Sequence, residues 1–381
     1  MSPILIRWLP GCVVSFVSTI LIAKVWQVQN GASLEQLQHY FPDLLRYFES
    51  SAWVVGHGVL YKDIFSEYPL LANLLFAGVR WINHLFGDSF IGFSVLWIAF
   101  AALCTGTMCT MAFRFIAANF PTINLWVTTF AWLTPGILHF ALLRYDIYPA
   151  LATLCMMIFL YRKSYLIAAF WISIAIALKG YPVFLLPAIL VYVHGQTGYR
   201  SAWQFLLIAL ATPLMSLLLV ITFSGIDGLL SPFLFHGGRD FNPDSTYTVL
   251  CYLFNSPLHS ADLSPLPMIL QGLCVLVSVI LRPKNFNELV LALTLTIVGV
   301  INFSVFYSPQ FAIWLLPIAG LSFNRCIQYL LLAYGLWTGG YFILEYFRNL
   351  ECLLTLVAGL VALRLALMFV GFRSLQRLKS F

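Results

Sequence analysis

The sequence predicts an all-α integral membrane protein, a single polytopic domain over residues 1–381 with about 12 transmembrane helices. Hydrophobic residues make up 61% of the chain and charged residues only 9%, whereas the surface of a soluble domain needs roughly a quarter of its side chains charged. Apolar runs long enough to cross about 30 Å of hydrocarbon as helices recur along the chain. We expect helices because lipid offers no hydrogen-bond partner to an unpaired backbone.

The apolar runs define the expected elements in chain order. Spans are expected near residues 7–25, 90–113, 122–142, 147–161, 164–178, 181–194, 203–223, 266–281, 287–305, 309–322, 327–346 and 352–371. The first run carries Arg7 and Lys24 at its edges and lacks a small-residue cleavage site. We therefore expect it to be a retained helix and not a removed signal peptide. Two long outer loops remain, over residues 27–89 and 224–265.

The first outer loop is expected to be helical in part. Pro42 and Asp43 can open a short amphipathic helix over residues 44–55, which Gly56 would end. Residues 70–86 form an apolar stretch that we place on or dipping into the outer surface. Counting this stretch as a full span would move Arg114 to the outer side, against the charge pattern.

That charge pattern sets the expected orientation. Basic residues gather in the turns of one side and in the tail, at Arg114, Arg162, Lys163, Arg200, Arg282, Lys284, Arg325, Arg373, Arg377 and Lys379. By the positive-inside rule this side, with both termini, is cytoplasmic. Of the 14 acidic residues, all except Glu288 fall on the outer side. The formal charge of +6 is thus a topology signal, and no nucleic-acid partner is expected.

Five polar segments on the outer side could carry chemistry. They are the run from Phe41 to Phe76, Leu143 to Pro149, Leu178 to Pro182, His236 to Ser245, and Tyr307 to Gln310. Each also has a purely structural interpretation. Asp43 suits a helix N-cap, Arg144 and Asp146 suit a boundary salt bridge, and Lys179 suits a side chain reaching for the interface.

The cysteines and acidic residues do not form a recognisable metal motif. The eight cysteines are scattered, mostly within apolar runs, and no C-x-x-C occurs. They are expected to be small buried side chains, neither a disulfide framework nor a zinc site. No D-x-D motif for a nucleotide-bound metal is present. No certain cofactor is predicted, and a divalent metal stays open.

Taken together, the polar segments place three cations and several carboxylates on one surface above apolar helices. Arg144, Lys179 and Arg239 suit a lipid phosphate at headgroup depth. A carboxylate suits proton abstraction from an alcohol, and apolar grooves between helices suit a long isoprenoid tail. These are the requirements of glycosyl transfer from a lipid-phosphate donor.

These segments resemble motifs of the polytopic GT-C glycosyltransferases, and above all of the glycosyltransferase family 87 mannosyltransferases, which use polyprenyl-phosphate mannose. The matching residues, in family order, are Asp43, Tyr47, Gly56, Leu60-Tyr61, Asp63, Glu67-Tyr68-Pro69, Arg144-Tyr145-Asp146 with Pro149, Lys179-Gly180-Tyr181-Pro182, and Ser308-Pro309-Gln310 with Trp314 and Pro317. The match covers residues 43–317, most of the chain. It departs at Leu70, where the family more often has a second proline.

The resemblance implies a GT-C-like bundle with its site between the first outer loop and the helices. It implies a polyprenyl-phosphate sugar donor, a lipid or glycan acceptor and surrounding membrane lipids. It assigns the catalytic base to Asp43, and the donor phosphate would bind Arg144, Lys179 or Arg239. The remaining substrate-binding candidates are Tyr47, Tyr61, Asp63, Glu67, Tyr68, Asp146, Tyr181, His236 and Gln310. For Asp63, Glu67 and Asp146, a role in holding loops is the alternative.

Other classes of function also fit parts of the pattern. A transporter or flippase for a lipid-linked sugar would use the same membrane bundle, but it usually has paired repeats and charges near the midplane. A scaffold would not need cations and carboxylates in apposed outer loops. An acyltransferase would need a catalytic His deep in a span, and His139 has no evident partner in the sequence.

Overall fold

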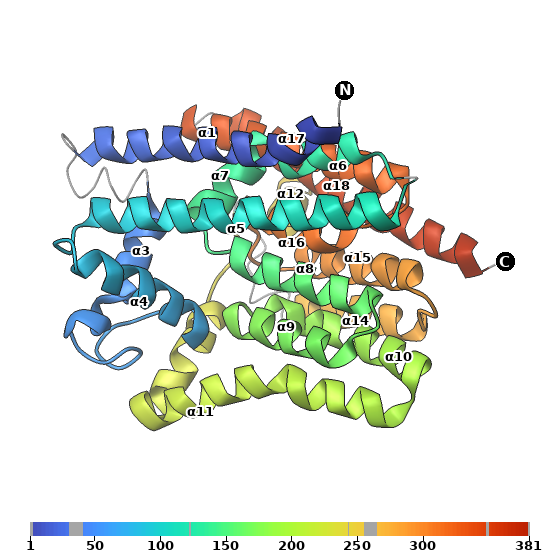
Figure 1. Cartoon of the computed structure of the whole chain (residues 1–381), viewed down its shortest axis with the longest axis horizontal. Coiled ribbons are helices and arrows are strands. Elements are labelled where there is room, and N and C mark those ends of the chain that lie inside the picture. The colour runs from blue at the N-terminus through green and yellow to red at the C-terminus, as the bar shows by residue number, and fades with distance from the viewer. Residues whose placement is uncertain are drawn as a thin grey trace.

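The chain folds into a bundle of helices. The computed structural model describes residues 3–29, 41–121, 123–242, 244–254, 265–347 and 350–379 (Figure 1). Over these ranges the regular structure is helical, and the one β-type contact is an isolated bridge between Leu60 and Ile64. The all-α prediction is therefore confirmed for the part of the chain that the structure describes.

The described helices follow one another along the chain, and the stretch from 56 to 69 separates η1 from α4. In chain order they are α1 Pro3–Gln29, α3 Pro42–Ser50, η1 Ala52–Val55, α4 Leu70–His84, α5 Phe90–Asn119, α6 Leu125–Trp132, α7 Pro135–Leu143, α8 Ile147–Tyr161, α9 Tyr165–Leu178, η2 Tyr181–Leu185, α10 Leu186–Thr197, α11 Tyr199–Gly237, α12 Thr246–Leu253, α14 Leu266–Ile280, α15 Phe286–Asn302, η3 Pro309–Phe311, α16 Ala312–Ala319, α17 Arg325–Phe347 and α18 Leu350–Lys379. The elements labelled η are short 3₁₀-helices.

Every predicted apolar run corresponds to helix, and the differences lie at proline and glycine. The run 122–142 is divided into α6 and α7, which meet at 49°. Thr134 is extended there because Pro135 at the first position of α7 disfavours a helical residue before it. The run 203–223 does not end where predicted, because α11 continues to Gly237 through a kink at Gly225 with φ of 71°. The second outer loop is thus helical in its first part.

Length and hydropathy identify a smaller set of membrane-crossing helices than the twelve runs. In the described ranges, four helices are long and apolar enough to cross a membrane, namely α1, α5, α11 and α18. The bent pair of α6 and α7 would make five. The apolar helices α8, α9, α14 and α15 have 14 to 17 residues, fewer than the roughly 20 that cover the hydrocarbon thickness. These features are those of a membrane protein.

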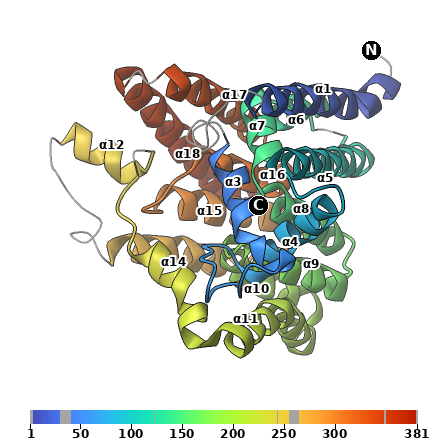
Figure 2. The same ribbon diagram turned by 90° about the vertical axis from the view of Figure 1, so that its left-hand side faces the viewer.

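The described part of the predicted first outer loop, residues 41–89, lies at one end of the bundle and is here called the first outer segment. In Figure 1, α1 begins and α18 ends toward the right, whereas α3 and α4 lie at the left-hand end. Figure 2 looks onto that left-hand end and shows α3 among the ends of the surrounding helices. The predicted helix over 44–55 is present as α3 and η1, and Gly56 ends η1 in the left-handed region at φ of 91°. The stretch after Pro69 forms α4, as expected.

An ion pair fastens α4 to α3 and to the start of α5. Arg80 of α4 is buried, and it donates from Nε and Nη2 to the Asp88 carboxylate at 3.1 and 3.0 Å. It also donates to the backbone carbonyl of Phe48 in α3. The hydrogen bond from Arg80 lowers the pKa of Asp88 from its ordinary value. Arg80 thus holds α4 against α3 and against the residues before α5.

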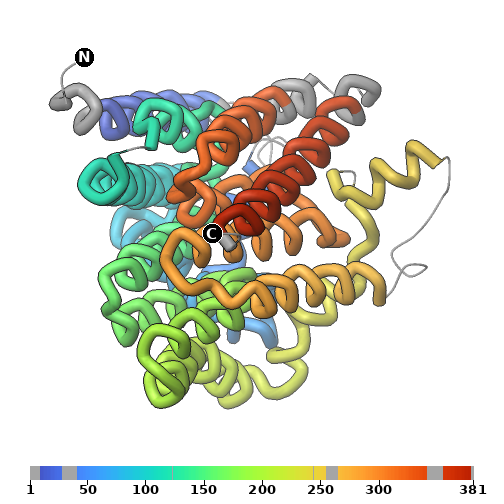
Figure 3. Tube along the Cα trace, turned by 90° about the vertical axis from the view of Figure 1, so that its right-hand side faces the viewer, coloured from blue at the N-terminus to red at the C-terminus, as the bar shows by residue number. Residues whose placement is uncertain are grey.

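Close helix contacts depend on glycine at the α7–α17 crossing. Figure 3 shows α17 and α18 side by side in the upper part of the bundle, and α7 packs against α17. A Cβ at Gly136 of α7 would lie 2.4 Å from the backbone nitrogen of Gly339 in α17. Small residues at such crossings let helix backbones approach closely, which is how helices associate in lipid.

The variant Gly136→Ala is expected to lower stability by about 1–3 kcal/mol, because backbone atoms must move apart to admit the methyl group. The matched control is Gly106→Ala in α5, where nothing lies within 4 Å of the new Cβ. That control should be neutral or slightly stabilising, since Ala favours helix over Gly. Thermal unfolding of the purified protein in detergent measures both, and equal unfolding midpoints would contradict the expectation.

Candidate functional site

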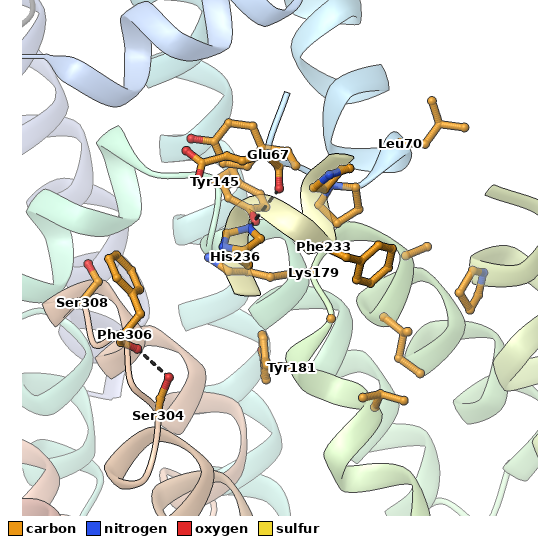
Figure 4. Close-up of a pocket in the computed structure, with 18 of the residues that line it drawn as sticks. Glu67, Leu70, Tyr145, Lys179, Tyr181, Phe233, His236, Ser304, Phe306 and Ser308 are labelled. Carbon is orange, nitrogen blue, oxygen red and sulfur yellow. Dashed lines mark hydrogen bonds between the residues drawn. The ribbon is translucent and has the colours of Figure 1, made fainter. Parts of the chain in front are cut away.

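A cavity of about 720 Å³ lies between the first outer segment and the bundle. Its walls come from α3, the residues before α4, the α7–α8 turn, the α9–η2 turn, α11 from Pro213 onward, and the segment from α15 to α16 (Figure 4). Eleven of the 13 predicted site residues line it: Asp43, Tyr47, Tyr61, Glu67, Tyr68, Arg144, Lys179, Tyr181, His236, Arg239 and Gln310. Residues far apart in the sequence thus share one space.

Asp43 meets Arg144 across this cavity. Asp43 lies in the first turn of α3, whose N-cap is Phe41 with no side-chain cap, so the N-cap interpretation of Asp43 is wrong. Its Oδ2 forms an ion pair with Nη1 of Arg144. Arg144 follows α7 in an extended conformation, which directs the chain out of the helix at this point. The Asp43 side chain is 13% exposed and the Arg144 side chain is 25% exposed, so the ion pair is partly accessible from the cavity.

Lys179 is held by a buried carboxylate behind the cavity wall. Its Nζ lies 2.6 Å from Oδ1 of Asp146, and the Trp314 indole donates to the same oxygen at 2.5 Å. Asp146 is fully buried, whereas the Lys179 side chain is 15% exposed and lines the cavity. Burial lowers the pKa of Lys179, and the Asp146 carboxylate opposes that shift. The Asp146 carboxylate therefore stabilises the charged form of Lys179 against the effect of burial.

Glu67 joins two cations from opposite sides of the cavity. One carboxylate oxygen pairs with Arg46 of α3 at 2.9 Å, and the other pairs with Arg239 at 2.6 Å. The backbone carbonyl of Glu67 lies 3.2 Å from Nε2 of His236. Figure 4 shows Glu67 above His236 and Lys179. The end of α11 is thereby tied to the first outer segment.

Tyrosines build the wall behind Glu67. The Tyr61 hydroxyl donates to the Tyr68 carbonyl and accepts from Asn73 at 2.9 Å. The Tyr47 hydroxyl accepts from the backbone N–H of Tyr145 at 3.3 Å. Burial raises the pKa of Tyr61 and of Tyr68, so both hydroxyls stay protonated at neutral pH. These hydrogen bonds hold α3, α4 and Tyr145 in place relative to one another.

An aromatic stack forms the floor on the α16 side. The Tyr181 ring lies 4.2 Å from the Trp314 ring at an interplanar angle of 3°, and Phe311 stacks on Trp314 at 3.9 Å. Gln310 lines the cavity next to this stack, and its Oε1 is buried without a hydrogen-bond partner. A buried carbonyl oxygen without a donor is costly, so this atom suits a hydroxyl of a bound molecule.

The rest of the cavity is an apolar slot. It runs between α11 and α15 and is lined by Pro213, Leu217, Val220, Leu229, Pro232, Phe233, Val300 and Ile301. The kink at Gly225 divides the α11 residues of this wall into two groups. A hydrocarbon chain matches such a surface, because burying apolar area is favourable at about 25 cal/mol per Å².

Two predicted substrate-binding residues, Asp63 and Asp146, do not line the cavity and have protein partners. Oδ2 of Asp63 accepts from the backbone N–H of Val59 at 2.8 Å and so closes its own loop. Asp146 lies beneath the cavity and holds Lys179. Neither lines the cavity, so contact of these two residues with substrate stays a prediction. Holding a loop was the stated alternative for both.

Two residues at or beside the site, Arg46 and Asn242, were not predicted from the sequence. Arg46 lies three positions after Asp43 on one helix, and this spacing could have revealed it. Asn242 accepts from the Tyr307 backbone N–H at 2.9 Å and donates to the Tyr307 carbonyl, so it fixes the segment after Arg239 beside Gln310. No local sequence signal indicates this contact. In the described ranges, no group of three or more His, Cys, Asp and Glu residues is placed to hold a metal ion.

Comparison of the chain with known proteins finds no family model, no curated protein and no solved structure that matches it.

Proposed function

We propose that this protein is a membrane glycosyltransferase of the GT-C type, and more narrowly a mannosyltransferase. It moves a hexose from a polyprenyl-phosphate sugar to a hydroxyl of a lipid or glycan on the extracytoplasmic face. The architecture proposed with it is a bundle of about 12 membrane helices, in which the shorter apolar helices cross together with their flanking turns. Both termini are then cytoplasmic. Figure 1 supports this, because α1 begins and α18 ends at the same end of the bundle.

One observation carries the proposal. A single cavity holds a carboxylate of α3, a set of cations and an apolar slot. The four cations Arg46, Arg144, Lys179 and Arg239 face the three carboxylates Asp43, Glu67 and Asp146. The cluster thus has one positive charge in excess, which complements the single negative charge of a phosphodiester. The slot of α11 and α15 suits the hydrocarbon tail of the same molecule.

The chemistry is an inverting displacement. The Asp43 carboxylate takes the proton of the acceptor hydroxyl while that oxygen forms a bond to the anomeric carbon. The bond between the anomeric carbon and the phosphate oxygen breaks, and its electron pair stays on the phosphate. One negative charge therefore disappears from Asp43 as another appears on the leaving polyprenyl phosphate. Arg144 contacts Asp43 in the cavity, so the same cation can face both charges.

The direct test is transfer by the purified protein. Labelled polyprenyl-phospho-sugars with different hexoses are incubated with the protein and a lipid extract from the source membrane. Transfer of label from one donor into a lipid or glycan product, with release of polyprenyl phosphate, is the expected result. Binding of the donors without release of polyprenyl phosphate would contradict the proposal.

A transporter for a lipid-linked sugar is the second candidate, and the broken helices favour it. The bend between α6 and α7 and the kink at Gly225 are of the kind that transporters use at their binding sites. The two functions separate when the protein is reconstituted in vesicles. A transporter moves the intact donor between leaflets, whereas the proposed transferase cleaves it.

A further inference from the structure

Each cation of the cavity already has a carboxylate partner, but the three carboxylates are held differently. Glu67 is shared by Arg46 and Arg239. Asp146 is fully buried and accepts from Lys179 and from the Trp314 indole. Within the described residues, the ion pair of Asp43 is with Arg144 alone. Withdrawing one cation therefore has a different consequence for each carboxylate.

We propose that Arg144 keeps Asp43 inactive as a base until the anionic donor binds, and that the donor phosphate then draws Arg144 away. The donor consequently binds before the acceptor hydroxyl can be deprotonated. This inference rests on the proposed function, and it concerns the regulation of the same site.

The geometry supports exchange at Arg144 and not at the other cations. A guanidinium offers five donors in a fork that matches both carboxylate and phosphate, and the partly open Arg144 side chain can turn between them. Lys179 cannot do the same, because Asp146 would be left charged and fully buried. Withdrawal of Arg239 would leave Glu67 still paired with Arg46, so no carboxylate would be released.

Pairing also explains why exchange matters for the reaction. A carboxylate held against a guanidinium accepts a proton poorly, since the cation stabilises its charged form. Once Arg144 faces the phosphate, Asp43 can take the acceptor proton, and the leaving phosphate gains its second charge beside Arg144. In the empty site the Asp43 carboxylate is paired with Arg144, whereas in the occupied site it is released to accept a proton.

The experiment measures how readily Asp43 reacts with a carbodiimide and an amine, read by peptide mass spectrometry at one mildly acidic pH. The reagent requires a protonated carboxyl, so pairing slows labelling. Saturation of the wild-type protein with polyprenyl phosphate should raise Asp43 labelling about tenfold, the effect of losing one charge-assisted hydrogen bond. Polyprenol, which has the tail without the phosphate, should leave the labelling unchanged.

Variants separate the ion pair from other effects of the ligand. Arg144→Gln should raise Asp43 labelling about tenfold without any ligand, and polyprenyl phosphate should add no further increase. The matched control is Arg46→Gln. This variant removes a cation that lines the same cavity and lies on α3 with Asp43, but whose ion pair is with Glu67. Asp88, paired with Arg80 outside the cavity, is the internal reference in every sample.

The outcomes distinguish this inference from the proposed function. Binding of polyprenyl phosphate is measured separately, as a rise in the unfolding temperature with ligand concentration. If the phosphate binds but Asp43 labelling stays unchanged or falls, the exchange at Arg144 is overturned while the transferase proposal stands. The same holds if Arg144→Gln leaves Asp43 labelling unchanged. If polyprenyl phosphate does not bind at all, the proposed function itself fails.

Discussion

Replacement of Asp43 by Asn should lower the rate of glycosyl transfer by about 10²–10⁴-fold, the usual contribution of a positioned general base. Asn has the same shape and can still accept a hydrogen bond from Arg144, but it cannot take a proton. We therefore expect the unfolding temperature to change little. The donor should bind at least as tightly as to the wild type, because Arg144 is no longer held by a charged partner. The measurement is transfer of labelled sugar under saturating donor and acceptor, so that the loss appears in kcat.

The matched control for this variant is Asp63→Asn. Asp63 belongs to the same outer segment, but its carboxylate closes a loop outside the cavity. An Asn oxygen can accept the same hydrogen bond from Val59, so transfer should remain close to that of the wild type. An Asp43→Asn protein with full transfer would remove Asp43 from the role of base. Equal losses in both variants would point to a structural effect of the loop.

Replacement of Asp146 by Asn is expected to have the largest effect on stability. The change leaves Lys179 without its carboxylate while the side chain stays mostly buried. Breaking a buried ion pair from one side costs about 3–5 kcal/mol, because the remaining charge loses its partner. A fall in the thermal unfolding midpoint in detergent measures the effect, and transfer should also decline as Lys179 loses its charge.

The pH dependence gives this variant a signature. Burial lowers the pKa of Lys179, and Asp146 opposes the shift, so the variant should lower that pKa further. The unfolded chain then binds more protons than the folded one, and the stability of the variant rises with pH toward the unfolded lysine value of about 10.4. The deficit against the wild type should therefore shrink as the pH is raised.

A double variant separates the structural from the functional part. Asp146→Asn combined with Lys179→Met removes both charges and should recover much of the stability, since a buried ion pair contributes little beyond an apolar replacement. Transfer should stay low, because the cavity would lack one of the cations that we propose face the donor phosphate. Recovery of transfer together with stability would show that Lys179 has no part in binding the donor.

The site shows how far local sequence rules reach. The motifs around Asp43, Arg144, Lys179 and Gln310 were all placed on the outer side, because the positive-inside rule assigns the opposite turns to the cytoplasm. Their convergence on one cavity was expected from that common face. The ion-pair partners, in contrast, could not be predicted from the sequence. Pairing of Asp43 with Arg144 and of Glu67 with Arg239 joins segments more than 100 positions apart, and neither segment specifies the other.

The positions of Asp63 and Asp146 outside the cavity have the same origin. Asp63 and Asp146 have the residue type and position of substrate-binding carboxylates, yet each accepts hydrogen bonds from protein donors. Whether a carboxylate faces a cavity or the wall behind it depends on the direction of its backbone within the fold. The continuation of α11 beyond residue 223 was missed for a related reason, since its polar end is stabilised by contacts of His236 and Arg239 with the first outer segment.

The sequence by itself determined that this chain is helical, apolar and suited to a membrane, and where most helices begin and end. Those properties depend on the hydropathy of short stretches and on proline and glycine, whose effects act within a few residues. The tertiary structure alone decided which cation pairs with which carboxylate, where the cavity lies and how the α11 kink shapes it. Such features depend on contacts between distant segments, and their energies exist only once the helices have packed.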